Sequence, residues 1–189
     1  ILYEKNIDKQ LPIARITKIM TAVIALEEIE NLEEIAIVSR ESTLVPGSKV
    51  WLSQGEKIKY KDLLNSLLIS SGNDAAFAIA ENVAGSQELF VQKMNAKAKS
   101  LGMENTHFAN SHGLDDPDNY STASDIALLA GYALKKNFIR SIIDIKELNV
   151  MSASGISHHL TSTNKLLGVD PEIKGLKTGS TLGAGECLV

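Results

Sequence analysis

The chain has 189 residues, about the length of one globular domain. Hydrophobic residues make up 44% and charged residues 22%, which argues against a disordered or collagen-like chain. The 19 basic and 23 acidic residues give a formal net charge of −4, so no nucleic-acid partner is expected. The single cysteine, Cys187, excludes an internal disulfide.

In chain order, the pattern of apolar and polar residues first predicts short strands and two helices. The first helix, from Ala14 to about Ile29, is apolar on more than one face, so we expect other elements to cover most of it. The expected elements are a strand over 2–6, the helix over 14–29, strands over 34–39 and 49–52, and an amphipathic helix over 60–70.

Three more helices follow, and strands close the chain. Ser86 and Thr122 are favourable N-cap residues, and Gly85 and Gly102 are typical helix stops. The predicted helices cover 74–83, 86–102 and 122 to about 136, and the predicted strands cover 146–151, 173–178 and 185–189. This order predicts an α+β fold, in which an antiparallel sheet assembled from distant segments carries a helical cluster.

Three short motifs carry the functional signal. Lys18 lies in the run Ala-Arg-Ile-Thr-Lys-Ile-Met-Thr-Ala, followed by Ser71-Gly72-Asn73 and then by Lys177-Thr178-Gly179. Each motif alone is weak, and Ser71 and Asn73 could also form the turn or N-cap before a helix at Asp74. The order and spacing of all three together are far more specific.

Together these motifs resemble those of serine-type D-alanyl-D-alanine carboxypeptidases, which are low-molecular-mass penicillin-binding proteins of the peptidase S11 type. The resemblance covers nearly the whole chain and includes the runs at 2–6, 17–22, 101–103, 113–115 and 120–123. It implies a penicillin-binding-protein/β-lactamase-like transpeptidase fold and a single, incomplete catalytic domain over 1–189. The family's C-terminal β domain is not expected in this chain.

The resemblance also implies a function. Family members remove the terminal D-Ala from peptidoglycan stem pentapeptides through an acyl-enzyme, and β-lactams inhibit them. The implied location is extracytoplasmic, in the bacterial cell envelope. No cofactor is expected, and any contact with a membrane would come from segments outside this chain.

Residue roles carry over by position. Lys18 would be the general base, and Ser71 and Asn73 would relay protons and bind the substrate amide. Lys177 and Thr178 would bind the terminal carboxylate. The remaining three positions act through the backbone: Gly179 would leave room for the substrate main chain, and the amides of Arg15 and Ser180 would form the oxyanion hole.

One position departs from the family pattern. The nucleophilic serine belongs three residues before the motif lysine, and this chain has Arg15 there. Arginine has no hydroxyl and stays protonated, so we expect the chain to be inactive or nearly so. Thr17 would point away from Lys18 on a helix, and rescue of the reaction by Ser71 is disfavoured.

Two alternative functions remain. Arg15 could bind a substrate carboxylate, which would make the chain a non-hydrolysing, peptidoglycan-binding pseudoenzyme. A class A β-lactamase is less favoured, because the middle motif is Ser-Gly-Asn and no Glu-x-x-Leu-Asn-type loop is found. No metal site is predicted, since the histidines lack partners at ligand spacing and His158 and His159 would face opposite sides of a strand.

The ends of the sequence suggest an excerpt of a longer protein, truncated on both sides. The chain starts at Ile1 without a signal peptide, and its last residues still have the pattern of a strand. No run of 18 apolar residues predicts a membrane span. We also expect Cys187 to be a core residue of that last strand rather than a reactive thiol.

Overall fold

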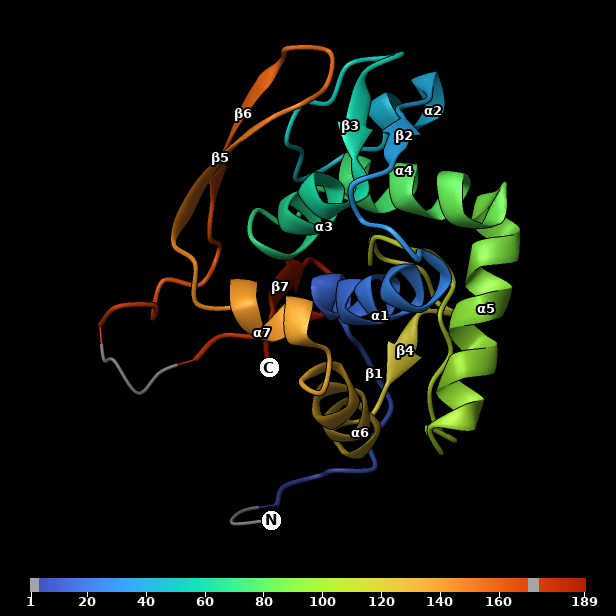
Figure 1. Cartoon of the computed structure of the whole chain (residues 1–189). Helices are drawn as coiled ribbons and strands as arrows, with labels where there is room; N and C mark the ends of the chain where they lie inside the picture. Colours follow the sequence, from blue (N-terminus) through green and yellow to red (C-terminus); the bar gives the residue numbers. More distant parts are fainter. Residues whose placement is uncertain (1–3, 170–173) are drawn as a thin grey trace.

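The computed structural model, which describes residues 4–169 and 174–189, has an α+β fold around one central helix, α1 (Lys18–Glu28). Nearly every residue of its first two turns is buried, as the apolar pattern predicts. Helices α3, α4, α5 and α6 all contact α1 (Figure 1). The other helices in chain order are α2 (Arg40–Leu44), α3 (Tyr60–Leu68), α4 (Asn73–Ala84), α5 (Gln87–Ser100), α6 (Ala123–Ala133) and α7 (Asn137–Ile142).

The strands of the described residues form four separate two-stranded antiparallel sheets rather than the one larger sheet that we expected. Two of these sheets do join distant segments, and the other two are hairpins. The pairs are β1 (Leu11–Pro12) with β4 (Tyr120–Ser121), β2 (Ile35–Ile37) with β3 (Lys57–Lys59), β5 (Glu147–Met151) with β6 (Ser157–Thr161), and β7 (Thr178–Thr181) with β8 (Gly185–Leu188).

The predicted helices α3 to α6 are confirmed within a few residues, and so are their end signals. The side chain of Ser86 accepts a hydrogen bond from the Leu89 amide, and that of Thr122 accepts one from the Asp125 amide. Gly85 follows α4 in the left-handed region at φ +81°. The short helices α2 and α7 and the strands β1, β3, β4 and β6 were not predicted, because helices of five or six residues and strands of two to five residues carry little periodicity.

The predicted helix over 14–29 begins differently. Residues Ala14–Thr17 form a short 3-10 helix, η1, and the α-helix starts only at Lys18. Side chains three residues apart eclipse each other in a 3-10 turn. Arg15 and Lys18 therefore lie on the same side of the chain at this junction.

The predicted strand over 49–52 is wrong. The carboxylate of Asp74, at the start of α4, accepts hydrogen bonds from the amides of Val50 and Leu52, which a strand partner would otherwise bind. The side chains of Val50 and Leu52 are buried. Trp51 between them takes φ +62° and is 77% exposed.

The predicted terminal strands also shift. Residues 4–6 form no strand, and the rest of the strand predicted over 2–6 lies outside the described residues. Of the strand predicted over 173–178, position 173 is likewise undescribed, and β7 begins only at Thr178. Lys177 nevertheless pairs with Val189 through two main-chain hydrogen bonds. Cys187 lies on β8 as predicted, half-buried against the core.

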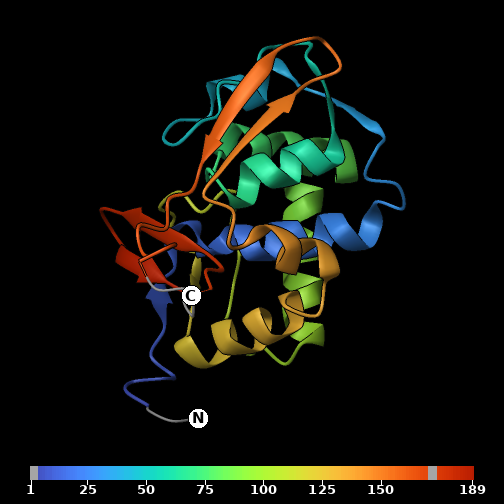
Figure 2. The same cartoon turned by 60° about the vertical axis from the view of Figure 1, so that its left-hand side comes forward.

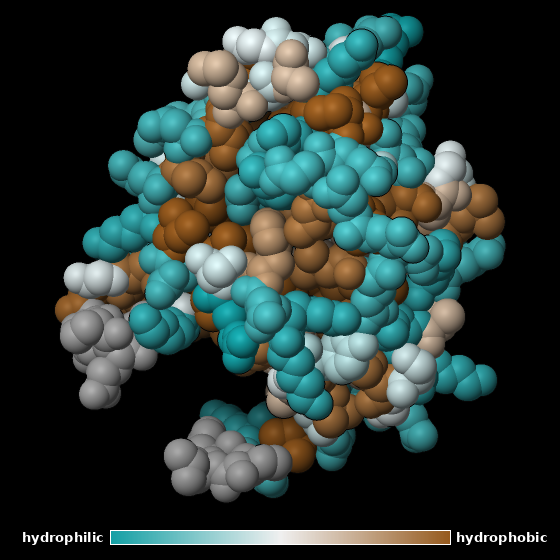
Figure 3. Space-filling model, viewed as in Figure 1, coloured by the Kyte–Doolittle hydropathy of each residue, from teal (hydrophilic) through white to brown (hydrophobic). Residues whose placement is uncertain are grey.

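The β7–β8 hairpin lies beside the start of α1, as Figure 2 shows. The face seen in Figure 3 is mostly hydrophilic, with apolar areas between the polar side chains. None of the helices within residues 4–169 and 174–189 is both long and apolar enough to cross a membrane.

Candidate active site

Lys18 is the most deeply buried cation of the motifs. Its side chain is 0% exposed, and its Nζ donates hydrogen bonds to Asn73 Oδ1 at 2.7 Å and to the His112 carbonyl oxygen at 2.5 Å. An amine without water needs such acceptors, because an unpaired buried polar group is costly. The helix start, the Ser-Gly-Asn segment and the loop around His112 therefore meet at one atom.

The surroundings of Lys18 favour a neutral amine. Burial is the largest cause that lowers its pKa well below the ordinary value, and the positive charges of Lys177 and Arg15 act in the same direction. Asp74 opposes this shift. The partial positive charge at the N-terminus of α1, where Lys18 lies, also disfavours an ammonium. A neutral amine in this position can accept a proton.

Ser71 and Asn73 form the wall opposite α1. Asn73 is fixed from both sides, because its Nδ2 donates to the Pro46 carbonyl oxygen at 2.7 Å and its amide donates to the Ser48 carbonyl oxygen at 2.7 Å. Ser71 is 0% exposed at φ +59°, and its hydroxyl has no hydrogen-bond partner among the described residues. Buried orphan hydroxyls and strained backbones are both uncommon outside functional sites.

The alternative role of Ser71 and Asn73 as helix caps is not supported. The N-cap residue of α4 is Gly72, and no side chain caps this helix. The carboxylate of Asp74 bonds to the 50–52 segment instead. A helix-capping role therefore does not account for the buried hydroxyl of Ser71.

Arg15 and Gly179 approach each other main chain to main chain. A Cβ atom added to Gly179 would lie 2.8 Å from the Arg15 amide nitrogen and 3.3 Å from Ala14 Cβ. Such a contact is closer than real Cβ atoms make, so a glycine is needed for η1 to pack on β7. The structure thus gives Gly179 a packing reason, and its role toward a ligand stays a prediction.

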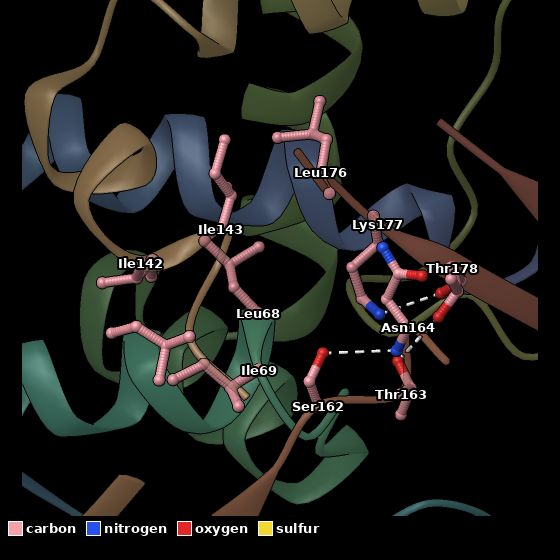
Figure 4. A pocket seen from close by; sticks show the side chains of 12 residues that line it. Leu68, Ile69, Ile142, Ile143, Ser162, Thr163, Asn164, Leu176, Lys177 and Thr178 are labelled. Carbon is pink, nitrogen blue, oxygen red and sulfur yellow. Dashed lines mark hydrogen bonds between the residues drawn. The ribbon is translucent and has the colours of Figure 1, made fainter. Parts of the chain in front are cut away.

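Lys177 and Thr178 line a small pocket from the strand side (Figure 4). Lys177 is buried, and its Nζ donates to the Thr178 carbonyl oxygen at 2.8 Å. Burial first, and then the charge of Arg15, lower the pKa of Lys177 to about 7. The Thr178 and Thr163 hydroxyls lie 2.6 Å apart and share a hydrogen bond. Behind them, between Lys177 and the apolar ends of α3 and α7, lies a cavity of about 10 Å³, room for about one water.

A larger cavity of about 470 Å³ opens between η1, the β7–β8 hairpin and the loop after β6. Among the predicted site residues, four line this cavity and four do not. The lining residues are Arg15, Thr178, Gly179 and Ser180, joined by the loop 163–166 and by Glu186, Cys187 and Leu188. Lys18, Ser71, Asn73 and Lys177 are buried and do not line it.

The guanidinium of Arg15 has a buried donor that is unpaired among the described residues. Its Nε is buried, and no acceptor for it exists within the part of the chain that the structure describes. A charged donor that is buried without an acceptor is costly, unless a bound molecule completes its hydrogen bonds. The position predicted for the nucleophile therefore holds an unused cationic donor.

Two contributors to the site were missed by the sequence analysis. His112 acts through its carbonyl oxygen, and burial followed by the charge of Lys18 lowers the pKa of its ring to about 4. Gly113, at φ +79°, approaches the Ala14 carbonyl so closely that a Cβ would lie 2.1 Å away. Main-chain contacts leave no side-chain signature. The glycine directly after His112 was the available signal, because glycine is the residue that most readily allows a positive φ and a close main-chain approach.

Other residues considered in the sequence lie outside the site. The Thr17 hydroxyl accepts a hydrogen bond from Asn119 Nδ2, away from Lys18 as expected. His158 is buried between Glu56 and the Val50 carbonyl oxygen, whereas His159 is exposed on the other face of β6, which confirms the predicted opposition. Within the described ranges no group of three His, Cys, Asp or Glu side chains could hold a metal ion.

Comparison with known proteins places these features in a family context. A sequence model of the D-alanyl-D-alanine carboxypeptidase family, peptidase S11, matches residues 1–189. DacF of Bacillus subtilis is 37% identical over 192 residues, and DacC of Escherichia coli is 38% identical over 203 residues. Both alignments cover 100% of this chain and 49% of the relative, so the chain spans about half the length of these proteins.

Solved structures agree with the sequence comparison. The Streptomyces K15 DD-transpeptidase matches with a TM-score of 0.92 at 31% identity, over 100% of this chain and 78% of that one. The carboxypeptidase DacD from Francisella tularensis matches with a TM-score of 0.91 at 29% identity, over 100% of this chain and 58% of that one. The expected fold class is confirmed along the whole length of the chain.

Proposed function

This chain belongs to the D-alanyl-D-alanine carboxypeptidase family, and we propose that it forms the part that recognises peptidoglycan stem peptides ending in D-Ala-D-Ala. The observation that carries this proposal is the buried Lys18 amine on Asn73, beside the contact of Arg15 with Gly179. The family kinship supports an extracytoplasmic site of action in the bacterial cell envelope.

Each motif has a role in the proposed site. Lys18, whose amine is driven toward the neutral form, would serve as the general base. The orphan hydroxyl of Ser71 would relay a proton to the leaving group, while Asn73 binds the substrate amide. Lys177 and Thr178 would hold the terminal carboxylate by charge and hydrogen bond.

The backbone would stabilise the reacting carbonyl. The amides of Arg15 and Ser180 belong to η1 and β7, which pack closely because Gly179 has no side chain. Two amides aimed at one carbonyl oxygen form an oxyanion hole. These donors do not depend on the side chain at position 15.

With Arg15 at this position, the chain would nevertheless recognise peptides without cleaving them. Arg15 offers no hydroxyl, so no acyl-enzyme forms at this position. Loss of the nucleophile in a comparable serine hydrolase removes a factor on the order of 10⁶ in rate. We therefore expect a non-hydrolysing peptidoglycan binder that keeps the carboxypeptidase framework.

Labelling with a fluorescent penicillin tests this proposal. We expect no covalent label on the chain with Arg15, and a label that survives denaturing electrophoresis on Arg15→Ser. Arg40→Ser is the matched control, because Arg40 is exposed and does not line the cavity. A label on the Arg15 chain would contradict the loss of acylation. A folded Arg15→Ser protein that stays unlabelled would contradict the proposed machinery.

A further inference from the structure

The charges around Arg15 do not balance. Burial drives Lys18 toward the neutral amine and lowers the pKa of Lys177 to about 7, whereas the guanidinium of Arg15 stays protonated, and Lys165 lines the same cavity as Arg15. The nearby carboxylate of Asp74 is already engaged by main-chain amides. A site with this composition lacks an anion, and a ligand can supply it.

Arg15 is also the group best placed to meet that anion. Its side chain lines the cavity of about 470 Å³, and its buried Nε has no acceptor among the described residues. A guanidinium offers parallel N–H donors that fit the two oxygens of a carboxylate. The acidic residue on the cavity wall, Glu186, is exposed to water and leaves the Nε of Arg15 unpaired.

We infer that Arg15 converts the nucleophile position into a carboxylate-binding subsite, so that the chain prefers stem peptides ending in a single D-Ala over those ending in D-Ala-D-Ala. This inference rests on the proposed function, because it uses the placement of the peptide along β7. It adds the identity of the preferred ligand, which is the product of the family reaction rather than its substrate.

The preference follows from the chemistry of the group that faces Arg15. In a peptide ending in D-Ala-D-Ala, the terminal carboxylate lies at Lys177 and Thr178, and a neutral amide faces position 15. In a peptide shortened by one residue, the same carbonyl carbon carries a carboxylate. The guanidinium gains a charge-assisted, bidentate partner only in the second case.

Titration calorimetry with two acetylated peptides tests the inference. The peptides are diacetyl-L-Lys-D-Ala and diacetyl-L-Lys-D-Ala-D-Ala, and the first in its C-terminal amide form is the probe without a carboxylate. We expect the single-D-Ala peptide to bind about tenfold or more tightly than the longer one, and its amide to lose that advantage. Arg15→Gln removes the charge without creating a nucleophile, so the preference should disappear.

Two further variants sharpen the result. Arg15→Lys keeps the charge but not the fork of donors, so it should retain part of the preference. Arg40→Ser should retain all of it. Equal or tighter binding of the longer peptide by the Arg15 chain would overturn the inference and leave the proposed function standing. If neither peptide binds the folded Arg15 chain or Arg15→Gln, the proposed function itself fails.

Discussion

The two walls of the site differ in burial and in their access to the cavity. On the helical wall, Lys18 and Asn73 are 0% exposed, and the Lys18 amine has protein acceptors. On the strand wall, Arg15 and Thr178 line an open cavity, and the buried Nε of Arg15 has no acceptor among the described residues. Among the described residues, the helical wall is therefore closed and keeps one unpaired group, the Ser71 hydroxyl, whereas the strand wall opens onto a cavity and keeps a cationic donor unpaired.

This difference shows where substitution is tolerated. Arg15 is long and charged, and the structure accommodates it because position 15 borders empty space. An arginine at position 73 would instead place a large cation in a closed core, because Asn73 is 0% exposed. Position 15 therefore accepts a wider range of side chains than position 73.

The largest predicted effect probes the helical wall. In the Arg15→Ser background, Lys18→Met removes the proton acceptor and should slow penicillin acylation by about 10²–10⁴-fold, the usual contribution of a general base. A time course of labelling with fluorescent penicillin, quenched at intervals, measures this rate. Lys57→Met, at an exposed lysine of β3, should leave it unchanged. Equal rates in both variants would remove Lys18 from the chemistry.

The second prediction tests the main-chain contact between Gly113 and Ala14, which joins the two walls. Gly113→Ala places a Cβ where the Ala14 carbonyl oxygen lies, and Gly113 also has φ +79°. We expect a loss of about 2–4 kcal/mol in the free energy of unfolding, which chemical denaturation measures.

Gly102→Ala is the matched control for this prediction. Gly102 has a similar φ of +76°, but nothing lies within 4 Å of the added Cβ. Its cost should be about 1 kcal/mol, from backbone strain alone. Equal losses in the two variants would mean that the contact of Gly113 with Ala14 does not hold the walls together.

The third prediction concerns pH. Lys177 has a pKa of about 7 in the folded state and an ordinary value of 10.5 when unfolded. Between these values the unfolded state binds more protons, so stability rises as pH increases from 7. The melting temperature between pH 7 and 8.5 should rise more steeply for the unsubstituted chain than for Lys177→Met. Parallel curves would contradict the depressed pKa.

The smallest predicted effect lies on the strand wall. Thr163→Val removes the hydrogen bond to the Thr178 hydroxyl, so Thr178 is less firmly oriented. We expect peptide affinity to fall by a factor of about 2–10, which corresponds to one ordinary hydrogen bond. Ser141→Ala on α7, whose hydroxyl bonds within its own helix, should not change it. An unchanged affinity in Thr163→Val would show that Thr178 is positioned by β7 alone.

The sequence predicted the parts of this molecule that depend on local pattern. Helices α3 to α6 follow from apolar periodicity and from caps such as Ser86 and Thr122. The three motifs named residues that the fold does bring together, Lys18 with Asn73 and Arg15 with Gly179. Their catalytic and ligand-binding roles remain predictions.

The parts that the sequence did not predict depend on distant partners. Asp74 determines the backbone conformation of the 49–52 segment, because its carboxylate accepts hydrogen bonds from the amides of Val50 and Leu52. The second acceptor of Lys18 is a main-chain oxygen at His112, and any residue type supplies one. Neither contact leaves a pattern in the neighbouring residues that a reader of the sequence could detect.

The amides of Val50 and Leu52, on both sides of Trp51, donate hydrogen bonds to Asp74. This arrangement has a practical consequence for fluorescence measurements. Trp51 is the single tryptophan of the chain, and it is 77% exposed in the native state. Its indole emission will already resemble that of a water-exposed fluorophore, so a red shift will be a poor signal of unfolding. Iodide quenching of the same fluorophore, by contrast, would register anything that covers the loop beside the Ser-Gly-Asn segment.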